Sequence, residues 1–223
     1  MINWKRRSAR ESAQLGSGGH IARHGLTDWF RTTFSTEEIE MMEERWKPFG
    51  ASSGATLTTG AHIGTDSPDP NDTYRFLYGL AGWFRTAKES HIAMRLFEKA
   101  REYEGDVISR HLYFTNYIPT RYKQRKDDPR AIADVVAACE EMISIAPRVR
   151  EEMKRQHGAQ ETRAIELGAA AQREEFAGVP PRHVGYERLI ILRRKAKQFE
   201  EVERLEKDYK IEWKDHSIDA RRS

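Results

Sequence analysis

The chain has 223 residues, 38% of them hydrophobic, which is enough for one good core or two small ones. Its 38 Lys and Arg exceed its 35 Asp and Glu by only three, an excess too small to indicate nucleic-acid binding. A single cysteine, Cys139, excludes an intramolecular disulfide framework. Because there is no long uncharged apolar run and no secretory signal at the N-terminus, we expect a cytoplasmic location.

The first third of the chain predicts little regular structure. Residues 1–26 are rich in Arg, Ser, Gly and His without periodicity, which predicts a flexible basic arm. Residues 27–50 predict a capped helix, because Ser35 and Glu38 have the spacing of a capping box. Residues 51–73 are dense in Gly, Ser, Thr and Pro and predict a long loop.

From Tyr74 onward the apolar residues recur at helical spacing and no strand pattern appears, so we predict an all-α fold. The expected helices lie at 74–86, 89–104, 107–124, 129–146, one or two between 148 and 177, 183–196 and 198–213. Gly158 and Gly168 weaken the helical pattern of residues 148–182.

Several of these helices share a packing pattern of small and large apolar residues. The first pair places on facing sides Leu77, Leu80, Ala81 and Phe84, then Ala93, Phe97 and Ala100. This spacing resembles the tetratricopeptide repeat, in which small residues let two antiparallel helices approach closely. Residues 185–209 are similar to a divergent copy, with Glu206 and Tyr209 as departures, and a middle copy needs an insertion near Pro129.

The resemblance covers about half the chain and implies antiparallel hairpins stacked as a short superhelical array over residues 74–214, followed by a tail at 215–223. An irregular helical bundle with an Ala-rich seam is the alternative. A polar second helix in residues 198–213 is typical of an end repeat, whose outer face meets water.

In arrays of this kind the first helix of each hairpin lines a concave surface that binds a peptide or a partner helix. The resemblance therefore implies a partner-binding surface made of Arg75, Tyr78, Arg85, Thr86, Tyr122, Lys123, Glu187, Ile191, Arg194 and Lys195. Such a groove would be cationic with aromatic residues, and its partner would be an acidic or carboxylate-ended protein or peptide.

No motif predicts catalysis, a cofactor or a metal site. His20 and His24 are four residues apart, but no third ligand accompanies them, so we interpret the spacing as accidental. His91 and His111 stand at helix starts and are expected to be surface or capping residues. Cys139 lies among apolar residues and is expected to be buried rather than nucleophilic.

The favoured function is therefore a non-enzymatic adaptor or scaffold. One alternative is nucleic-acid binding through three basic clusters, at residues 5–7, 121–126 and 193–197. The preference of helix C-terminal turns for Lys and Arg explains the last two clusters equally well. A further alternative is a self-assembling structural subunit, because a short array has apolar ends that need cover.

Overall fold

The computed structural model describes residues 18–47, 56–59, 68–166 and 182–214. Helices form the regular structure of these residues, and none of them lies in a strand, which confirms the all-α prediction. None of the described helices is long and apolar enough to cross a membrane. The chain divides into two compact units, residues 1–104 and 105–223, so the boundary falls inside the predicted repeat domain 74–214.

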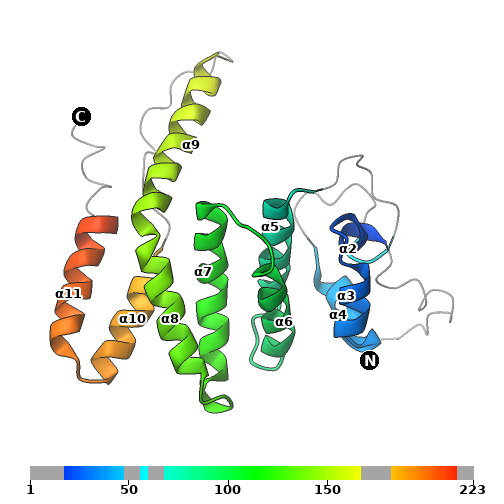
Figure 1. Ribbon diagram of the computed structural model, residues 1–223, viewed down its shortest axis with the longest axis horizontal. Coiled ribbons are helices and arrows are strands. Elements are labelled where there is room, and N and C mark those ends of the chain that lie inside the picture. The colour runs from blue at the N-terminus through cyan, green and yellow to red at the C-terminus, as the bar shows by residue number, and fades with distance from the viewer. Residues whose placement is uncertain (1–17, 48–55, 60–67, 167–181, 215–223) are drawn as a thin grey trace. The chain divides into compact units, whose positions relative to one another are not determined.

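The first unit contains five described helices (Figure 1): α2 (Gly19–Arg23), α3 (Thr27–Thr33), α4 (Thr36–Arg45), α5 (Pro70–Ala81) and α6 (Ser90–Ala100). Helices α5 and α6 pack against each other. The apolar residues predicted to form their seam, from Leu77 to Ala100, are all at most 1% exposed. Close packing of small and large side chains therefore holds this pair together.

Helix α2 lies within the arm that the sequence predicted to be flexible. It is held by backbone bonds from Gly18, His20 and Ile21 to the carbonyls of residues 56–58, at 3.0 to 3.1 Å. Gly19 has a positive φ of 62°, and a Cβ there would lie 2.2 Å from the Thr56 carbonyl oxygen. Glycine is thus required by both conformation and close approach. Residues 1–17 of the predicted arm lie outside the described residues.

The predicted capped helix is two helices, α3 and α4, separated by the cap. The Ser35 hydroxyl accepts from the Glu38 amide at 3.3 Å, and the Glu38 carboxylate accepts from the Ser35 amide at 2.9 Å. The capping box is therefore present as predicted. In the predicted loop 51–73, residues 56–59 are packed against α2, α5 already begins at Pro70, and the remainder up to residue 67 lies outside the described residues.

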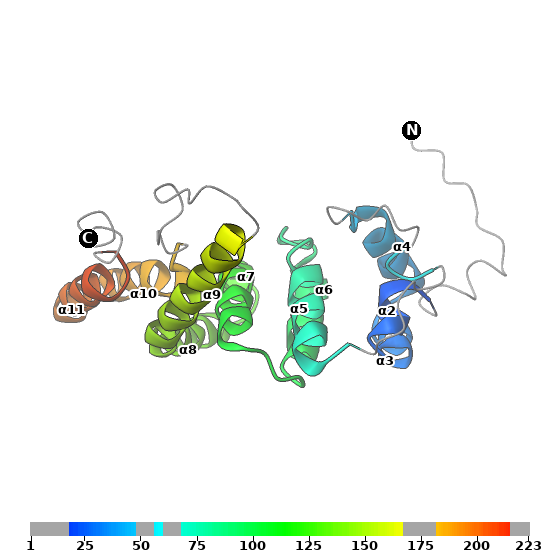
Figure 2. The ribbon, with the colours of Figure 1, turned by 90° about the horizontal axis from the view of Figure 1, so that it is seen from above.

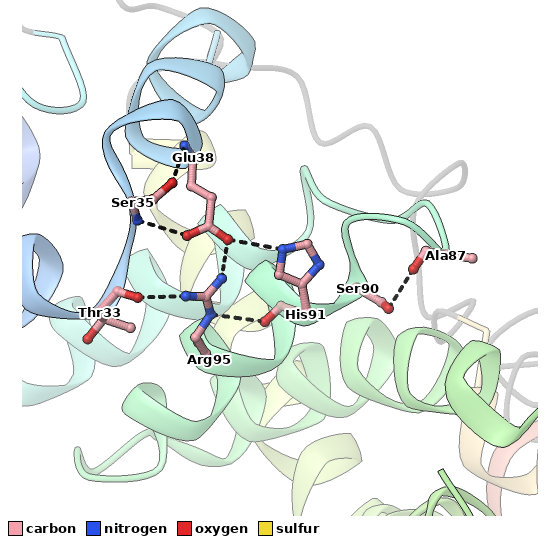
Figure 3. Close-up of polar contacts among 7 residues, drawn as sticks. All are labelled: Thr33, Ser35, Glu38, Ala87, Ser90, His91 and Arg95. Atoms are coloured by element: carbon pink, nitrogen blue, oxygen red, sulfur yellow. Dashed lines mark hydrogen bonds and ion pairs between the residues drawn. The ribbon is translucent and has the colours of Figure 1, made fainter. Parts of the chain in front are cut away.

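Glu38 also joins α4 to α6 (Figure 3). Its second oxygen accepts from His91 Nε2 at 3.0 Å and forms an ion pair with Arg95. Arg95 in turn donates to the Thr33 carbonyl at 2.6 Å, and its guanidinium carbon lies 4.6 Å from the centre of the Phe34 ring. Although burial raises the pKa of Glu38, the bonds from Arg95, Ser35 and His91 outweigh it and lower the pKa.

The second unit contains α7 (Val107–Lys123), the 3₁₀ turn η1 (Gln124–Lys126), α8 (Ala131–Ser144), α9 (Ala146–Glu166), α10 (Val184–Lys195), α11 (Phe199–Tyr209) and the π-helix η2 (Lys210–Lys214). Helix α7 packs on α8, α9 and α10, and α10 packs on α8 and α11 (Figures 1 and 2). Each predicted pair of helices thus forms a contact. Helix α9 runs through Gly158, and in Figure 1 it extends past the end of α8.

Gly185 sets the close approach of α10 to α8. A Cβ at this position would lie 3.1 Å from Met142 Sδ and 3.2 Å from the Cys139 carbonyl oxygen. The residue is at the buried start of α10, one position before Tyr186, which is 1% exposed. The two helices can therefore pack at this distance because the residue between them has no side chain.

Candidate functional site

Tyr122, at the end of α7, stands among three cations. The guanidinium carbons of Arg125 and Arg188 lie 4.3 Å and 4.2 Å from the centre of its ring. The Lys195 ammonium donates a hydrogen bond to its hydroxyl. Because both guanidinium carbons are measured from the same ring centre, they are at most 8.5 Å apart. One phenol ring at the end of α7 therefore organises three positive charges, two from helix α10 and one from the turn η1.

The turn that carries Arg125 is fixed by its neighbour Arg121. The Arg121 side chain is 10% exposed and forms ion pairs of 2.6 Å with both Asp128 and Asp134. It also donates to Gln124 Oε1 at 2.6 Å. A buried, fully engaged guanidinium holds the end of α7 against the start of α8. This anchor fixes the direction in which the following turn presents Arg125.

The charges around Tyr122 are not neutralised within the described part of the chain. Arg125, Arg188 and Lys195 form no ion pair with any carboxylate there. Burial by itself raises the pKa of Tyr122, but the hydrogen bond from Lys195 and the three positive charges outweigh it and lower the pKa. The direction of this shift shows that the local field favours negative charge.

Helix α10 adds an apolar residue to this surface. Arg188, Ile191 and Lys195 are spaced three and four residues apart, so they share one face of the helix. Ile191 is 39% exposed, one of six large apolar side chains that stand exposed in the described residues. We call Tyr122, Arg125, Arg188, Ile191 and Lys195 the cationic patch.

Six of the ten residues predicted to bind a partner lie in the second unit, and three of them, Tyr122, Ile191 and Lys195, belong to the cationic patch. Lys123 is exposed beside Tyr122. Glu187 pairs with Arg182 and Arg194 pairs with Glu206, so both have charge partners within the unit.

The other four predicted residues lie in the first unit. Arg75 is exposed, whereas Tyr78 is only 7% exposed and contacts Tyr74 edge to face. Arg85 Nε donates to the Gly82 carbonyl at 2.6 Å, and the Thr86 hydroxyl donates to Glu89 at 2.7 Å. These contacts close the turn between α5 and α6.

Two members of the patch were missed by the residue-level prediction. Arg125 lies in the 3₁₀ turn beyond the expected end of the helix, and Arg188 was not aligned with an exposed repeat position. Arg188 could have been found from its spacing, because it stands seven residues before Lys195 and residues at this spacing share a helix face.

Ion pairing changes the interpretation of the predicted basic clusters at 121–126 and 193–197. Arg121 is neutralised by two aspartates, Arg193 pairs with Glu140 at 2.9 Å, and Arg194 pairs with Glu206 at 2.6 Å. These helix ends are therefore not continuous tracts of available positive charge. The cluster at 5–7 lies outside the described residues.

A second polar cluster is buried under η2. His111 and His183 are both 0% exposed, with ring centres 5.3 Å apart, and both rings contact Trp213. Within the residues that the structure describes, neither nitrogen of His111 has a hydrogen-bond partner. The prediction that His111 is a surface or capping residue is wrong, because its ring faces the core of the unit. Burial lowers the pKa of His111 to about 4.

His183, in contrast, caps a helix. Its Nδ1 accepts from the Tyr186 amide at 3.3 Å at the start of α10. Burial, reinforced by the nearby His111, lowers its pKa to about 3. Two neutral imidazoles and an indole form a packed aromatic core here, and no group of three His, Cys, Asp or Glu in the described residues could hold a metal ion.

The remaining sequence candidates are packing residues. His20 contacts Trp46 edge to face at 4.7 Å, and His24 stacks on Phe76 at 4.4 Å. Cys139 is 0% exposed, and burial raises its pKa to about 12, which disfavours the thiolate needed for nucleophilic chemistry. A shallow, open surface hollow of about 670 Å³ lies at the turn between α10 and α11, beside the 65% exposed Phe199.

Comparison with known proteins gives no relative: no family model, curated protein or solved structure matches the chain.

Proposed function

We propose that the chain is a non-enzymatic interaction module that binds an acidic segment of a protein partner through the cationic patch. The observation that supports it most directly is the arrangement of Arg125, Arg188 and Lys195 around one tyrosine without a neutralising carboxylate in the described residues. Three positive charges held close together repel one another and create a positive potential at the surface. An acidic partner reduces this repulsion when it binds.

The residues around the charges favour a protein partner. Ile191 is exposed between Arg188 and Lys195, and Tyr122 offers a partly exposed ring. Aromatic, arginine and apolar side chains together are typical of protein interfaces. Ion pairing of Arg193 and Arg194 argues against an extended nucleic-acid surface at the same helix end, because such a surface needs charges that reach phosphates.

The pairing of helices supports a tetratricopeptide-like organisation for this role. The pairs α5–α6, α7–α8 and α10–α11 each form a contact, and α10 also packs on α7 and α8. In such an array the first helix of each hairpin carries the binding surface. Arg188, Ile191 and Lys195 lie on a first helix, α10, and Tyr122 lies on another, α7. The single buried cysteine suits a module that works in a reducing compartment such as the cytoplasm.

Binding of a fluorescently labelled polyglutamate peptide to the full chain tests this proposal. At low salt we expect the anisotropy of the peptide to rise as the chain is added. We expect the affinity obtained from this titration to be at least tenfold weaker in the double variant Arg188→Glu, Lys195→Glu. A polylysine peptide of equal length should not bind. Screening by salt should weaken the complex, because much of the attraction is between exposed charges.

The matched control is Lys154→Glu with Arg163→Glu on α9, which changes the net charge equally at two exposed positions of the same unit. It should bind polyglutamate like the unmodified chain. Equal loss in both double variants would show that net charge alone drives binding and would overturn the site. Tighter binding of a single-stranded RNA than of the peptide, again lost in the patch variant, would replace the protein partner with nucleic acid.

A further inference from the structure

Helix α4 carries a row of three acidic residues, of which Glu37 accepts a hydrogen bond from Ser35 at the start of the helix. Glu37, Glu40 and Glu44 recur at spacings of three and four, so they lie along one side of the helix. None of them forms an ion pair with a cation in the described residues. We call Glu37, Glu40, Met41 and Glu44 the acidic stripe.

The other two glutamates of α4 are bound to other parts of the first unit. Glu38 binds Arg95 and His91, and Glu43 accepts from the Thr58 amide at 2.8 Å and from its hydroxyl at 2.6 Å. Within the acidic stripe, carboxylates three and four residues apart repel one another. The dipole at the start of α4 favours Glu37 but falls off within the first turn, before Glu44.

The acidic stripe and the cationic patch match in spacing. Arg188 and Lys195 stand seven residues apart with Ile191 between them, and Glu37 and Glu44 stand seven residues apart with Met41 between them. At about 1.5 Å of rise per residue, each pair of charges is separated by about 10.5 Å along its helix. Each surface thus has an apolar centre with charges of one sign at both ends.

We propose that the acidic segment bound by the cationic patch is α4 of a second copy of this chain. The inference rests on the proposed function and names its partner. Helix α4 would lie along α10 of the other copy, with Met41 against Ile191 and carboxylates facing Arg188, Lys195 and Arg125. Apolar contact at the centre and ion pairs at the rim are the usual arrangement in a specific interface.

The contact joins two different surfaces of the chain. Two copies can therefore close it reciprocally as a dimer, or each copy can use its remaining surface to extend the association into rings or open chains. Because the charges are exposed, association is weak and depends strongly on salt.

Multi-angle light scattering of the full chain over a dilution series tests the inference. At low salt we expect a mass that rises with concentration above the monomer's 25.9 kDa, and in high salt a mass that stays at the monomer value. The triple variant Glu37→Lys, Glu40→Lys, Glu44→Lys should stay monomeric. The double variant Arg188→Glu, Lys195→Glu should stay monomeric as well. The two sets combined in one chain should restore association, because the charges are then exchanged.

The matched control replaces three exposed glutamates elsewhere, Glu151, Glu200 and Glu203, by lysine, and should associate like the unmodified chain. The helical circular dichroism signal of every variant verifies folding. A mass of 25.9 kDa at all concentrations, or association that persists in both charge variants, would overturn the inference. A monomeric chain that still binds polyglutamate through the patch would overturn only the second copy as partner. Loss of both would remove the proposed function as well.

Discussion

At the scale of single residues, Lys197 has an unusual backbone for a side chain of its kind. Its φ is 59°, and it is the one non-glycine among the described residues with a positive φ. The Gln198 amide donates to the Arg193 carbonyl and the Lys197 amide to the Arg194 carbonyl, both at 3.0 Å. These two bonds are a Schellman motif that ends α10, and glycine is the usual residue at this position.

Replacing Lys197 by glycine should therefore stabilise the chain. The left-handed conformation costs a side-chain-bearing residue about 1–2 kcal/mol, and the greater freedom of glycine in the unfolded chain offsets part of the gain. We expect the free energy of unfolding to rise by about 1 kcal/mol, measured by urea denaturation. Ala196→Gly, one residue earlier and at a negative φ of −80°, should not stabilise. A loss of stability in Lys197→Gly would contradict this account.

The buried histidines predict a pH dependence. The pKa values of His111 and His183, about 4 and about 3, lie below the 6.5 of an ordinary imidazole, so the unfolded chain binds more protons than the folded chain. Stability is complete above pH 6.5 and falls as the pH drops from there toward 4. Each histidine contributes a loss of about 1.4 kcal/mol per pH unit in this window.

His111→Phe removes the orphaned nitrogens and keeps a ring against Trp213. Urea denaturation gives the free energy of unfolding at pH 7.5 and at pH 5.5. We expect the loss between these two pH values to be about 1.4 kcal/mol smaller in the variant than in the unmodified chain. His157→Gln, at an exposed position of α9, is the control and should keep the full difference. An unchanged pH dependence in His111→Phe would show that His111 does not couple folding to protons.

At the scale of elements, Glu38 makes α4 both a capped helix and a partner of α6. Glu38→Gln separates these roles, because glutamine can still form a capping box but cannot pair with Arg95 and His91 as an anion. We expect a loss of about 1 kcal/mol at neutral pH, a value discounted for the partial exposure of the pair. Glu40→Gln, at a half-buried position of α4 without an ion pair in the described residues, should change stability by less than about 0.5 kcal/mol.

The cost of Glu38→Gln should depend on pH. Because the folded pKa of Glu38 is lowered, the ion pair contributes fully above the ordinary value of 4.5 and is lost as the pH falls through the folded pKa. Denaturation curves of the two chains should therefore converge below pH 4.5. A constant difference at acidic pH would mean that packing, and not charge, is lost in the variant.

Local pattern predicted most helices but not α2. Helix α7 was expected at 107–124 and runs over Val107–Lys123, because its apolar residues recur at helical spacing and Asp106 caps its start. Helix α2 has five residues and depends on carbonyls of residues 56–58. Since such a short helix is unstable alone and its partners are distant in sequence, no local signal indicates it.

At the scale of the whole molecule, the chain consists of two compact units, each with its own core. The boundary at Glu104 and Gly105 follows the packed helix pair α5–α6. Mutations influence one another's effect on stability mainly when their residues share contacts. We therefore expect a mutation in the core of one unit to destabilise that unit and to leave the other unchanged.

Leu96→Ala tests this separation. Leu96 is 0% exposed in α6, so the cavity should cost the first unit about 2–5 kcal/mol. Hydrogen exchange followed by mass spectrometry should show faster exchange in α5 and α6, and unchanged exchange in α8 and α10. Val135→Ala in α8 is the reciprocal variant and should give the opposite pattern. Faster exchange throughout the chain would show that the units unfold together.

The candidate site was predictable only in part, because it depends on how the helices of the whole chain pack together. Tyr122 and Lys195 were predicted from the resemblance to a helical repeat, but their contact joins residues 73 positions apart and depends on α10 packing on α7. Pairing of Arg121 with Asp134, and of Arg193 with Glu140, removes cations that the sequence counts equally with the others. Which charges remain available is a property of the tertiary fold.

Cys139 gives the second unit a chemical record of its own opening. The thiol is the only one in the chain, is 0% exposed, and has a pKa raised by burial to about 12. A thiol reagent can modify it only in molecules in which the core of the unit is exposed. The labelling rate therefore counts opening events at one site, and a partner that holds α10 against α8 should slow labelling, with no need for an engineered cysteine.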